Sequence, residues 1–462
     1  MKRRLSAAFA RDLASSYAAS VARVASWLIV SALVFRRGGA DDLALLMLLR
    51  GTVGLLSYAG LGLAPSLVHL LARPLPAIPV GPAPAAAESL GYAPAALPPT
   101  VAKTDRVFTT ALLLVCGVGA IAVWAGMMYV VAVPGLHGFR GLRAERAQYV
   151  AACFVAAVVL RLIGDVLGAR MQATNRLWFD NAILVVGEVA FVALVLASTG
   201  TATQAALAFG IATFITTVTR AVATIDGAKV FFSRFDRQLV VPLLGGGGLV
   251  LVSQLADWFY GPLNLVLLKA HLSLDAVVVY VPALQVDAAL LLLTAGLTNV
   301  LLPKSALYAA AGDRAGLRRA FVGGSAASLA ALSTAAFVIW IGCDTLFRWW
   351  FGDPLVGTQA ILPWVLLHTV LGSVGGVGRA VLLGMGRIKP YALAAITAGV
   401  ANALLAIGFV AFTDWGLRGV VLATIISVGA RSLIWTPWYT LRAIRQVNDR
   451  PRPLYPADAK TA

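Results

Sequence analysis

Long apolar runs alternate with short polar segments along most of the chain. A helix needs about 20 mainly apolar residues to cross the hydrocarbon core of a bilayer. Because lipid offers no partner for an unpaired backbone amide, runs of this length that are continuous in Leu, Val and Ala predict helices rather than strands. Twelve such spans are expected, at residues 14–36, 41–72, 107–133, 147–170, 178–198, 202–225, 239–268, 273–302, 319–343, 359–386, 390–412 and 416–441.

The composition excludes a water-soluble globular protein. Of the 462 residues, 60% are hydrophobic and only 12% are charged, whereas soluble domains have about 25% charged residues. The net charge of +17 comes from basic residues scattered between apolar runs, so a nucleic-acid partner is not expected. The three cysteines lie far apart and the four histidines form no ligand pair, so neither a metal site nor a cofactor is expected.

Lys and Arg are distributed unevenly between the two sets of loops. They are roughly three times as frequent in the N-terminus, the even-numbered loops and the C-terminus as in the odd-numbered loops, which places both termini in the cytoplasm. The apolar run that follows the basic start flows into a full span and is too long for a cleaved signal peptide. The sequence therefore predicts a multi-pass protein of the cytoplasmic membrane.

Twelve spans with a basic break near the middle predict an all-α polytopic membrane protein built as two six-helix lobes. The N-terminal lobe is expected over residues 1–225, with a Pro- and Ala-rich cytoplasmic loop at 73–106. A basic amphipathic linker is expected at 226–238, the C-terminal lobe at 239–441 and a cytoplasmic tail at 442–462.

Two arginines lie deep within the first two predicted spans. Arg23 and Arg50 are about ten or more residues from either end of their spans, on the order of 15 Å from water. Charged residues at that depth are costly, and no acidic residue lies within a turn of either one. Because a guanidinium fork matches phosphate, the pattern predicts a hydrated cavity that receives an anion. The alternative is structural pairing with acids on distant helices, and Glu188 in the fifth span is one acid expected to pair with a neighbouring arginine.

Glycine-rich and polar stretches interrupt the apolar runs in three regions. The first holds Arg36–Leu43 and Tyr58–Ala64, the second Leu382–Tyr391, and the third Asn402 and Trp415–Thr424. Together with the two halves of six spans, they resemble the multidrug/oligosaccharidyl-lipid/polysaccharide (MOP) flippase superfamily. Within it, the chain is similar to the polysaccharide repeat-unit branch, the flippases of O-antigen and exopolysaccharide units. The likeness covers nearly the whole chain, but none of its motifs is diagnostic of the substrate.

The resemblance implies a transporter and not an enzyme. Such relatives move polyprenyl-diphosphate-linked oligosaccharides from the inner to the outer leaflet by alternating access, around a cationic cavity between the lobes. It implies the inner membrane of a bacterium, surface polysaccharide biosynthesis, and polysaccharide polymerase machinery as a candidate partner. The expected diphosphate ligands are Arg23, Arg50, Arg379 and Arg431, and the expected sugar-stacking rings are Trp27 and Trp258. The candidate coupling-ion groups are Gln254, Asp257 and Asp287, although no motif marks the seventh-span residues as a cation site.

Two other functions stay open. A cation-coupled multidrug exporter of the same architecture would favour carboxylates and aromatic rings in its cavity over arginines. A membrane glycan polymerase would need a sizeable outer loop or a His/Asp catalytic set, whereas the longest outer loop expected here, near residues 134–146, is short.

Overall fold

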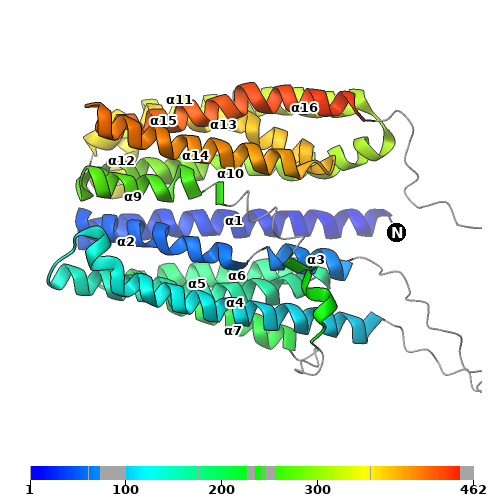
Figure 1. The fold of residues 1–462 in the computed structure, drawn as a ribbon, viewed down its shortest axis with the longest axis horizontal. Coiled ribbons are helices and arrows are strands. Elements are labelled where there is room, and N and C mark those ends of the chain that lie inside the picture. The colour runs from blue at the N-terminus through cyan, green and yellow to red at the C-terminus, as the bar shows by residue number, and fades with distance from the viewer. Residues whose placement is uncertain are drawn as a thin grey trace, which may run out of the picture.

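Two bundles of helices lie side by side along their length (Figure 1). The structure is a computed structural model, and it describes residues 2–60, 62–72, 100–174, 176–225, 235–241, 243–244, 255–256, 258–353 and 355–447. Eleven helices in these ranges are long and apolar enough to cross a membrane. They correspond to eleven of the twelve predicted spans, and the remaining one, 239–268, is described only in part.

The N-terminal lobe contains the elements α1 (Lys2–Gly38), α2 (Ala40–Val53), η1 (Gly54–Gly60), α3 (Leu63–Ala72), α4 (Thr100–His137), α5 (Leu142–Ala173), α6 (Leu177–Leu196) and α7 (Ala202–Ile225). Residues 100–106, which the sequence places in a loop, therefore form the first turns of α4. The rest of that predicted loop and most of the predicted linker, 226–234, lie outside the described residues.

The C-terminal lobe contains α9 (Pro262–His271), α10 (Leu274–Ala311), α11 (Arg314–Ile341), α12 (Cys343–Phe351), α13 (Val356–Gly384), α14 (Ile388–Phe412), α15 (Gly416–Gly429), the π-helix η5 (Ala430–Trp435) and α16 (Thr436–Arg445). The short η4 (Arg237–Leu239) precedes this lobe, and Leu239 and Leu243 pack with apolar residues of the N-terminal lobe.

The second predicted span, 41–72, is not one continuous helix. The α-helix ends at Val53, tightens into the 3-10 turn η1, and resumes as α3 at Leu63. Gly62 has a φ of +65°, a conformation that glycine adopts without a steric penalty, and the other glycines of this stretch weaken a continuous helix. Beyond the break, η1 packs against α2, α4 (Thr100–His137) and α5 (Leu142–Ala173) of the same lobe.

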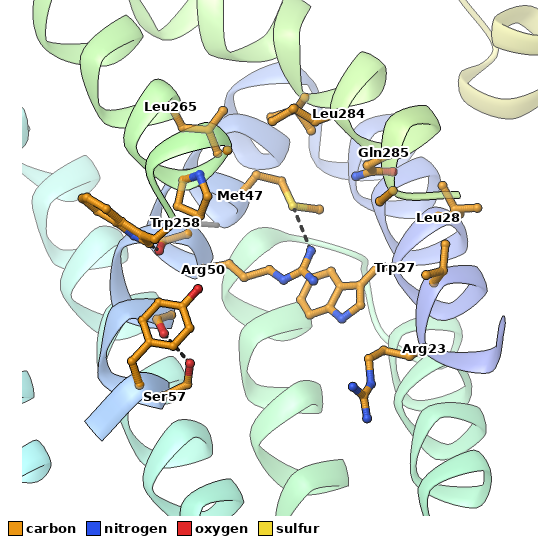
Figure 2. A pocket seen from close by; sticks show the side chains of 18 residues that line it. Arg23, Trp27, Leu28, Met47, Arg50, Ser57, Trp258, Leu265, Leu284 and Gln285 are labelled. Carbon is orange, nitrogen blue, oxygen red and sulfur yellow. Dashed lines mark hydrogen bonds between the residues drawn. The ribbon is translucent and has the colours of Figure 1, made fainter. Parts of the chain in front are cut away.

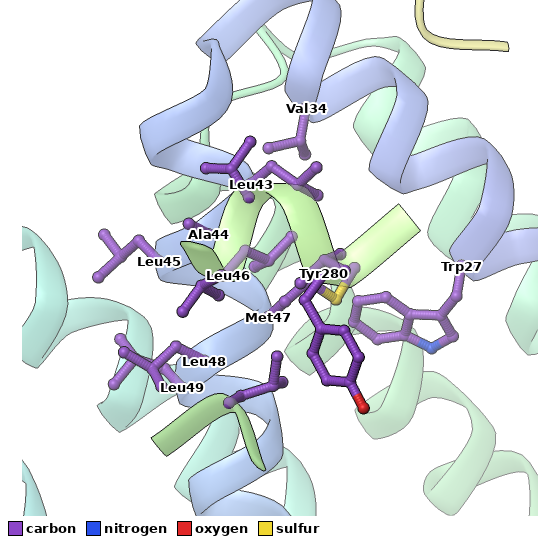
Figure 3. Packing of buried hydrophobic residues seen from close by; sticks show 14 of the residues in the cluster. Trp27, Val34, Leu43, Ala44, Leu45, Leu46, Met47, Leu48, Leu49 and Tyr280 are labelled. Atoms are coloured by element: carbon purple, nitrogen blue, oxygen red, sulfur yellow. The ribbon is translucent and has the colours of Figure 1, made fainter. Parts of the chain in front are cut away.

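The middle of α2 contributes fully buried leucines to a large apolar cluster. Leu43, Leu46 and Leu49 are fully buried, and they belong to one cluster with Trp27 of α1 and the fully buried Tyr280 of α10 (Figure 3). The cluster includes residues of both lobes, so burial of apolar surface joins the bundles there.

The short helix α12 was not expected from the sequence. It follows the ninth predicted span, and its aromatic side packs on α1: the rings of Phe351 and Phe35 are 5.2 Å apart, and Trp350 Nε1 donates a hydrogen bond to the carbonyl oxygen of Leu28 at 2.8 Å. A nine-residue amphipathic helix is too short to register as a span, which is why hydropathy alone misses it.

Candidate functional site

A cavity of about 410 Å³ lies between the two lobes (Figure 2). One wall comes from α1, α2 and η1, and the other from α10 and the segment 258–265. Four of the side chains expected to bind substrate line it: Arg23, Trp27, Arg50 and Trp258. Trp258 Nε1 donates a hydrogen bond to the carbonyl oxygen of Gly51 at 3.3 Å, which joins the two walls. The structure thus brings together residues that are more than 200 positions apart in the sequence.

Arg50 places a positive charge in this cavity. Its guanidinium carbon lies 3.6 Å from the centroid of the Trp27 ring, and its Nη1 lies 3.7 Å from the sulfur of Met47 (Figure 2). In the described part of the chain, no carboxylate lies within 4 Å of this guanidinium. An aromatic face attracts a cation without neutralising it. Arg50 is therefore held in position while its charge stays available to a ligand.

The ring of Trp27 is itself fixed by other aromatic side chains. It is only 6% exposed, and its centroid lies 5.1 Å from that of Phe191 and 5.3 Å from that of Phe209. A stacked contact with Phe154 at 6.5 Å completes its surroundings. The guanidinium of Arg50 covers one face of this ring, so Trp27 supports the position of Arg50.

Arg23 has an acidic neighbour, contrary to the interpretation of both deep arginines as unpaired. Its Nε lies 3.8 Å from Oε1 of Glu188 on α6, and Ser26 Oγ donates a hydrogen bond to Oε2 of the same carboxylate at 2.5 Å. The Arg23 side chain remains 43% exposed. The pairing partner comes from a helix distant in sequence, which is the alternative that the sequence left open for such residues.

Further ion pairs lie deeper in the N-terminal lobe. Arg220 on α7 is almost fully buried and lies 2.8 Å from Asp180 and 3.5 Å from Asp165. Arg161 lies 4.0 Å from Asp165, one turn along α5. Arg161, Asp165 and Arg220, together with Arg23 and Glu188, line a small second cavity of about 50 Å³ inside this lobe, which we term the intralobe cavity. It lies between α1, α5, α6 and α7.

The other two predicted diphosphate ligands lie elsewhere. Arg379 on α13 is exposed and is not among the residues that line the interlobe cavity. Arg431, in the π-helical turn η5, lines a separate groove of about 640 Å³ beside α14, and its guanidinium carbon is 5.2 Å from the ring centroid of Tyr260. Sequence position gives the depth of an arginine in its span but not the direction in which a packed helix turns it.

Of the three coupling-ion candidates, the structure describes only Asp287. Gln254 and Asp257 lie outside the described residues. Asp287 on α10 accepts a hydrogen bond from Thr369 Oγ1 at 2.5 Å and lies 3.8 Å from Nε2 of His368, both on α13. Within the described ranges, no cluster of three or more His, Cys, Asp or Glu side chains could hold a metal ion.

A buried cluster of neutral polar side chains joins α9, α14 and α15. Asn264 Nδ2 donates to Thr424 Oγ1 at 3.1 Å, Asn402 Nδ2 donates to Asn264 Oδ1 at 3.2 Å, and Thr424 Oγ1 donates to Asn402 Oδ1 at 3.0 Å. All three residues are 0% exposed. Sequence reasoning did not connect them because they come from three spans that are far apart in the sequence, and only the tertiary structure brings them into hydrogen-bond contact.

No protein-family model and no curated protein matches the sequence. Solved structures do match it. One is the inward-facing conformation of a multidrug resistance MATE family transporter of the MOP superfamily, with a TM-score of 0.76, 14% identity, 94% of this chain and 100% of that chain covered. Another is an outward-facing conformation of such a transporter, with a TM-score of 0.67, 15% identity and coverage of 94% and 95%.

This chain has the fold of the MATE transporters. The predicted fold class is thereby confirmed, since MATE transporters have twelve helices in two lobes. A further match is a MOP superfamily transporter from Pyrococcus furiosus, described by a reverse polarity of its binding pocket that suggests a different function; its TM-score is 0.62, its identity 16% and the coverage 95% and 96%. The similar structures are transporters and not enzymes, and the MATE fold is that of a multi-pass membrane protein.

Proposed function

We propose that this protein is a flippase that moves a polyprenyl-diphosphate-linked oligosaccharide repeat unit from the inner to the outer leaflet by alternating access. The observation that carries the proposal is the guanidinium of Arg50, which faces the interlobe cavity with no carboxylate within 4 Å among the described residues. A cation held by an aromatic ring in a half-buried cavity is suited to an anionic group. A diphosphate bridged to a sugar and a lipid presents such a group.

The polarity of the cavity supports this substrate class over cationic drugs. Arg23 and Arg50 both line it, and among the described residues no Asp or Glu contributes to its lining. The Pyrococcus furiosus relative, described by the reverse polarity of its pocket, supports the view that charge in this cavity separates functions within the fold. Carrying about two negative charges outward across an inside-negative membrane gains roughly 4–5 kcal/mol per 100 mV, so export of a diphosphate is favoured by the potential.

The remaining predicted residues take secondary roles in this proposal. Trp258, which lines the cavity, stacks on sugar, while Arg379 and Arg431 contact the diphosphate only in another conformation of the lobes. Asp287, with Gln254 and Asp257, is the candidate site of a coupling ion. The protein acts in the cytoplasmic membrane of a bacterium with both termini inside, and hands its product to polysaccharide polymerase machinery.

Reconstitution in liposomes tests the proposal directly. A fluorescent polyprenyl-diphosphate oligosaccharide is placed in the inner leaflet, and its arrival outside is followed with a membrane-impermeant glycosidase. We expect Arg50→Ala to lower the initial rate at least tenfold, and Arg348→Ala, on the exposed face of α12, to leave it unchanged. Equal rates for Arg50→Ala and the unmodified protein, with equal amounts reconstituted, contradict the assignment.

A cation-coupled multidrug exporter is the second candidate, because several of the similar structures are multidrug resistance transporters. Uptake of cationic dyes into energised inside-out vesicles distinguishes the two functions. Dye transport that survives Arg50→Ala, together with no movement of the lipid-linked sugar, favours the exporter.

A further inference from the structure

Gln285 is the polar side chain on the α10 wall of the interlobe cavity. The described residues of α10 that line this cavity are Val281, Leu284, Gln285 and Ala288, and the other three are apolar (Figure 2). They recur at intervals of three and four residues, so they share one face of the helix. Gln285 is only 8% exposed. A single amide in an otherwise apolar wall is the kind of group that fixes the orientation of a ligand.

The neighbours of Gln285 determine which end of its amide faces α1. The amide is bonded to Oγ of Ser31 at 2.5 Å, and that hydroxyl donates its own proton to the carbonyl oxygen of Trp27 at 2.6 Å. A serine hydroxyl has one proton, so with that proton engaged Ser31 can only accept from Gln285. The atom beside Ser31 is therefore Nε2, and Oε1 lies at the other end of the amide.

Oε1 of Gln285 is buried and has no hydrogen-bond partner among the described residues. A buried carbonyl oxygen without a partner is costly, and such groups are rare in native proteins. Nε2 is already engaged with Ser31, so what this side chain lacks is a donor. Because Gln285 lines the interlobe cavity, a ligand bound there can supply that donor.

The acceptor and the cation of the cavity are both attached to one turn of α1. The ring of Trp27 holds the guanidinium of Arg50 at 3.6 Å. The carbonyl oxygen of the same tryptophan accepts the hydrogen bond from Ser31, which in turn holds Gln285. Trp27 and Ser31 lie about one helical turn apart, roughly 6 Å along the axis. A ligand that reaches both groups must therefore carry a donor close to its anion, and it then contacts the two lobes at once.

We propose that Gln285 is a specificity-determining residue whose Oε1 accepts a hydrogen bond from the sugar attached directly to the diphosphate. This inference rests on the proposed function, because it places the diphosphate at Arg50. The donor is a hydroxyl or an acetamido N–H of that first sugar, the part of the glycan closest to the phosphates. A sugar that lacks this donor leaves the oxygen buried and unpaired, which weakens its binding.

Binding of UDP-glucose and four analogues to the purified full-length protein tests this contact. UDP-glucose is a soluble diphosphate diester with a sugar on one phosphate, and each analogue carries fluorine in place of the sugar hydroxyl at C2, C3, C4 or C6. Fluorine is close to a hydroxyl in size but cannot donate a hydrogen bond. Isothermal titration calorimetry measures each Kd. We expect at least one analogue to bind about 5- to 150-fold more weakly than UDP-glucose.

Two variants that remove the same interlobe hydrogen bond assign this discrimination to the acceptor. Gln285→Met keeps the length of the side chain but removes Oε1, so the ratio of the two Kd values should fall to about one. Ser31→Ala removes the hydrogen bond but keeps Oε1, so it should retain the ratio. A change in the balance of conformations alters the affinity for every probe alike and cancels in the ratio. Gln285→Ala replaces the methionine variant if the latter does not fold.

The outcomes separate this inference from the function on which it rests. Equal binding of UDP-glucose and all four analogues by the unmodified protein overturns the inference and leaves the anion site intact. Discrimination that persists in Gln285→Met overturns it too, because another group then contacts the sugar hydroxyl. Discrimination lost in both Gln285→Met and Ser31→Ala assigns the effect to the bond between the lobes and also overturns it. Failure of the unmodified protein to bind UDP-glucose overturns both the inference and the proposed function.

Discussion

Gln285 on α10 donates a hydrogen bond from its Nε2 to Oγ of Ser31 on α1, 2.5 Å away, and thereby joins the two lobes beside the interlobe cavity. Ser31 is 0% and Gln285 8% exposed. In a transporter with alternating access, bonds between the lobes bias the equilibrium between conformations, because they form only when these helices are in contact.

Removing this bond should shift the equilibrium between conformations. A buried neutral hydrogen bond contributes about 0.5–1.5 kcal/mol, so Ser31→Ala should raise the population with α1 and α10 apart by about 2- to 12-fold. Distances between spin labels on the two helices, measured by pulsed electron resonance, report that population. Thr298→Ala, whose hydroxyl bonds only to its own helix, is the matched control. Identical distance distributions for the Ser31 variant and the unmodified protein would show that the bond has no conformational role.

Trp27→Phe should weaken anion binding by about 2- to 30-fold. Phenylalanine keeps an aromatic ring among Phe154, Phe191 and Phe209 but offers the Arg50 guanidinium a poorer face, and cation–π contacts contribute about 0.5–2 kcal/mol. Titration with UDP-glucose measures the change. Trp415→Phe, at an exposed ring stacked on Phe409, serves as control and should leave the affinity unaltered. If both variants bind alike, the indole does not position Arg50.

Asp180→Asn should destabilise the N-terminal lobe strongly. It leaves the guanidinium of Arg220 buried beside a neutral amide, and breaking a buried ion pair on one side costs about 3–5 kcal/mol. The midpoint of thermal unfolding in a single detergent should fall accordingly. Asp344→Asn removes the same charge from a solvent-screened, exposed pair with Arg348 and should leave the midpoint nearly unchanged. Equal midpoints for the two variants are incompatible with a structural role of the buried pair.

Two glycine-to-alanine changes should act in opposite directions. A Cβ at Gly378 on α13 would overlap the side chain of Thr436 on α16, so Gly378→Ala should destabilise by about 1–3 kcal/mol. At Gly117 on α4, no atom lies within 4 Å of an added Cβ, so Gly117→Ala should stabilise by up to about 1 kcal/mol through helix propensity. Thermal unfolding of both variants measures the sign, and stabilisation by Gly378→Ala would mean that α13 and α16 are further apart than the structure places them.

The sequence by itself determined most of the helices of this protein and the depth of its arginines. Eleven predicted spans reappear as helices, because an apolar run in lipid has no other way to satisfy its backbone hydrogen bonds. The same physics places Arg23 and Arg50 far from the ends of their spans. Neither conclusion depends on which helices are neighbours in the fold.

Only the tertiary structure decided which charges are neutralised and which face a cavity. Glu188 approaches Arg23 across 165 positions of sequence, whereas Arg50 lies against the ring of Trp27, and Arg379 is not among the residues that line the interlobe cavity. Electrostatic pairing depends on distances of a few ångströms between helices, and those distances are set by packing over the whole bundle. The hydropathy pattern of the sequence does not contain these distances between helices.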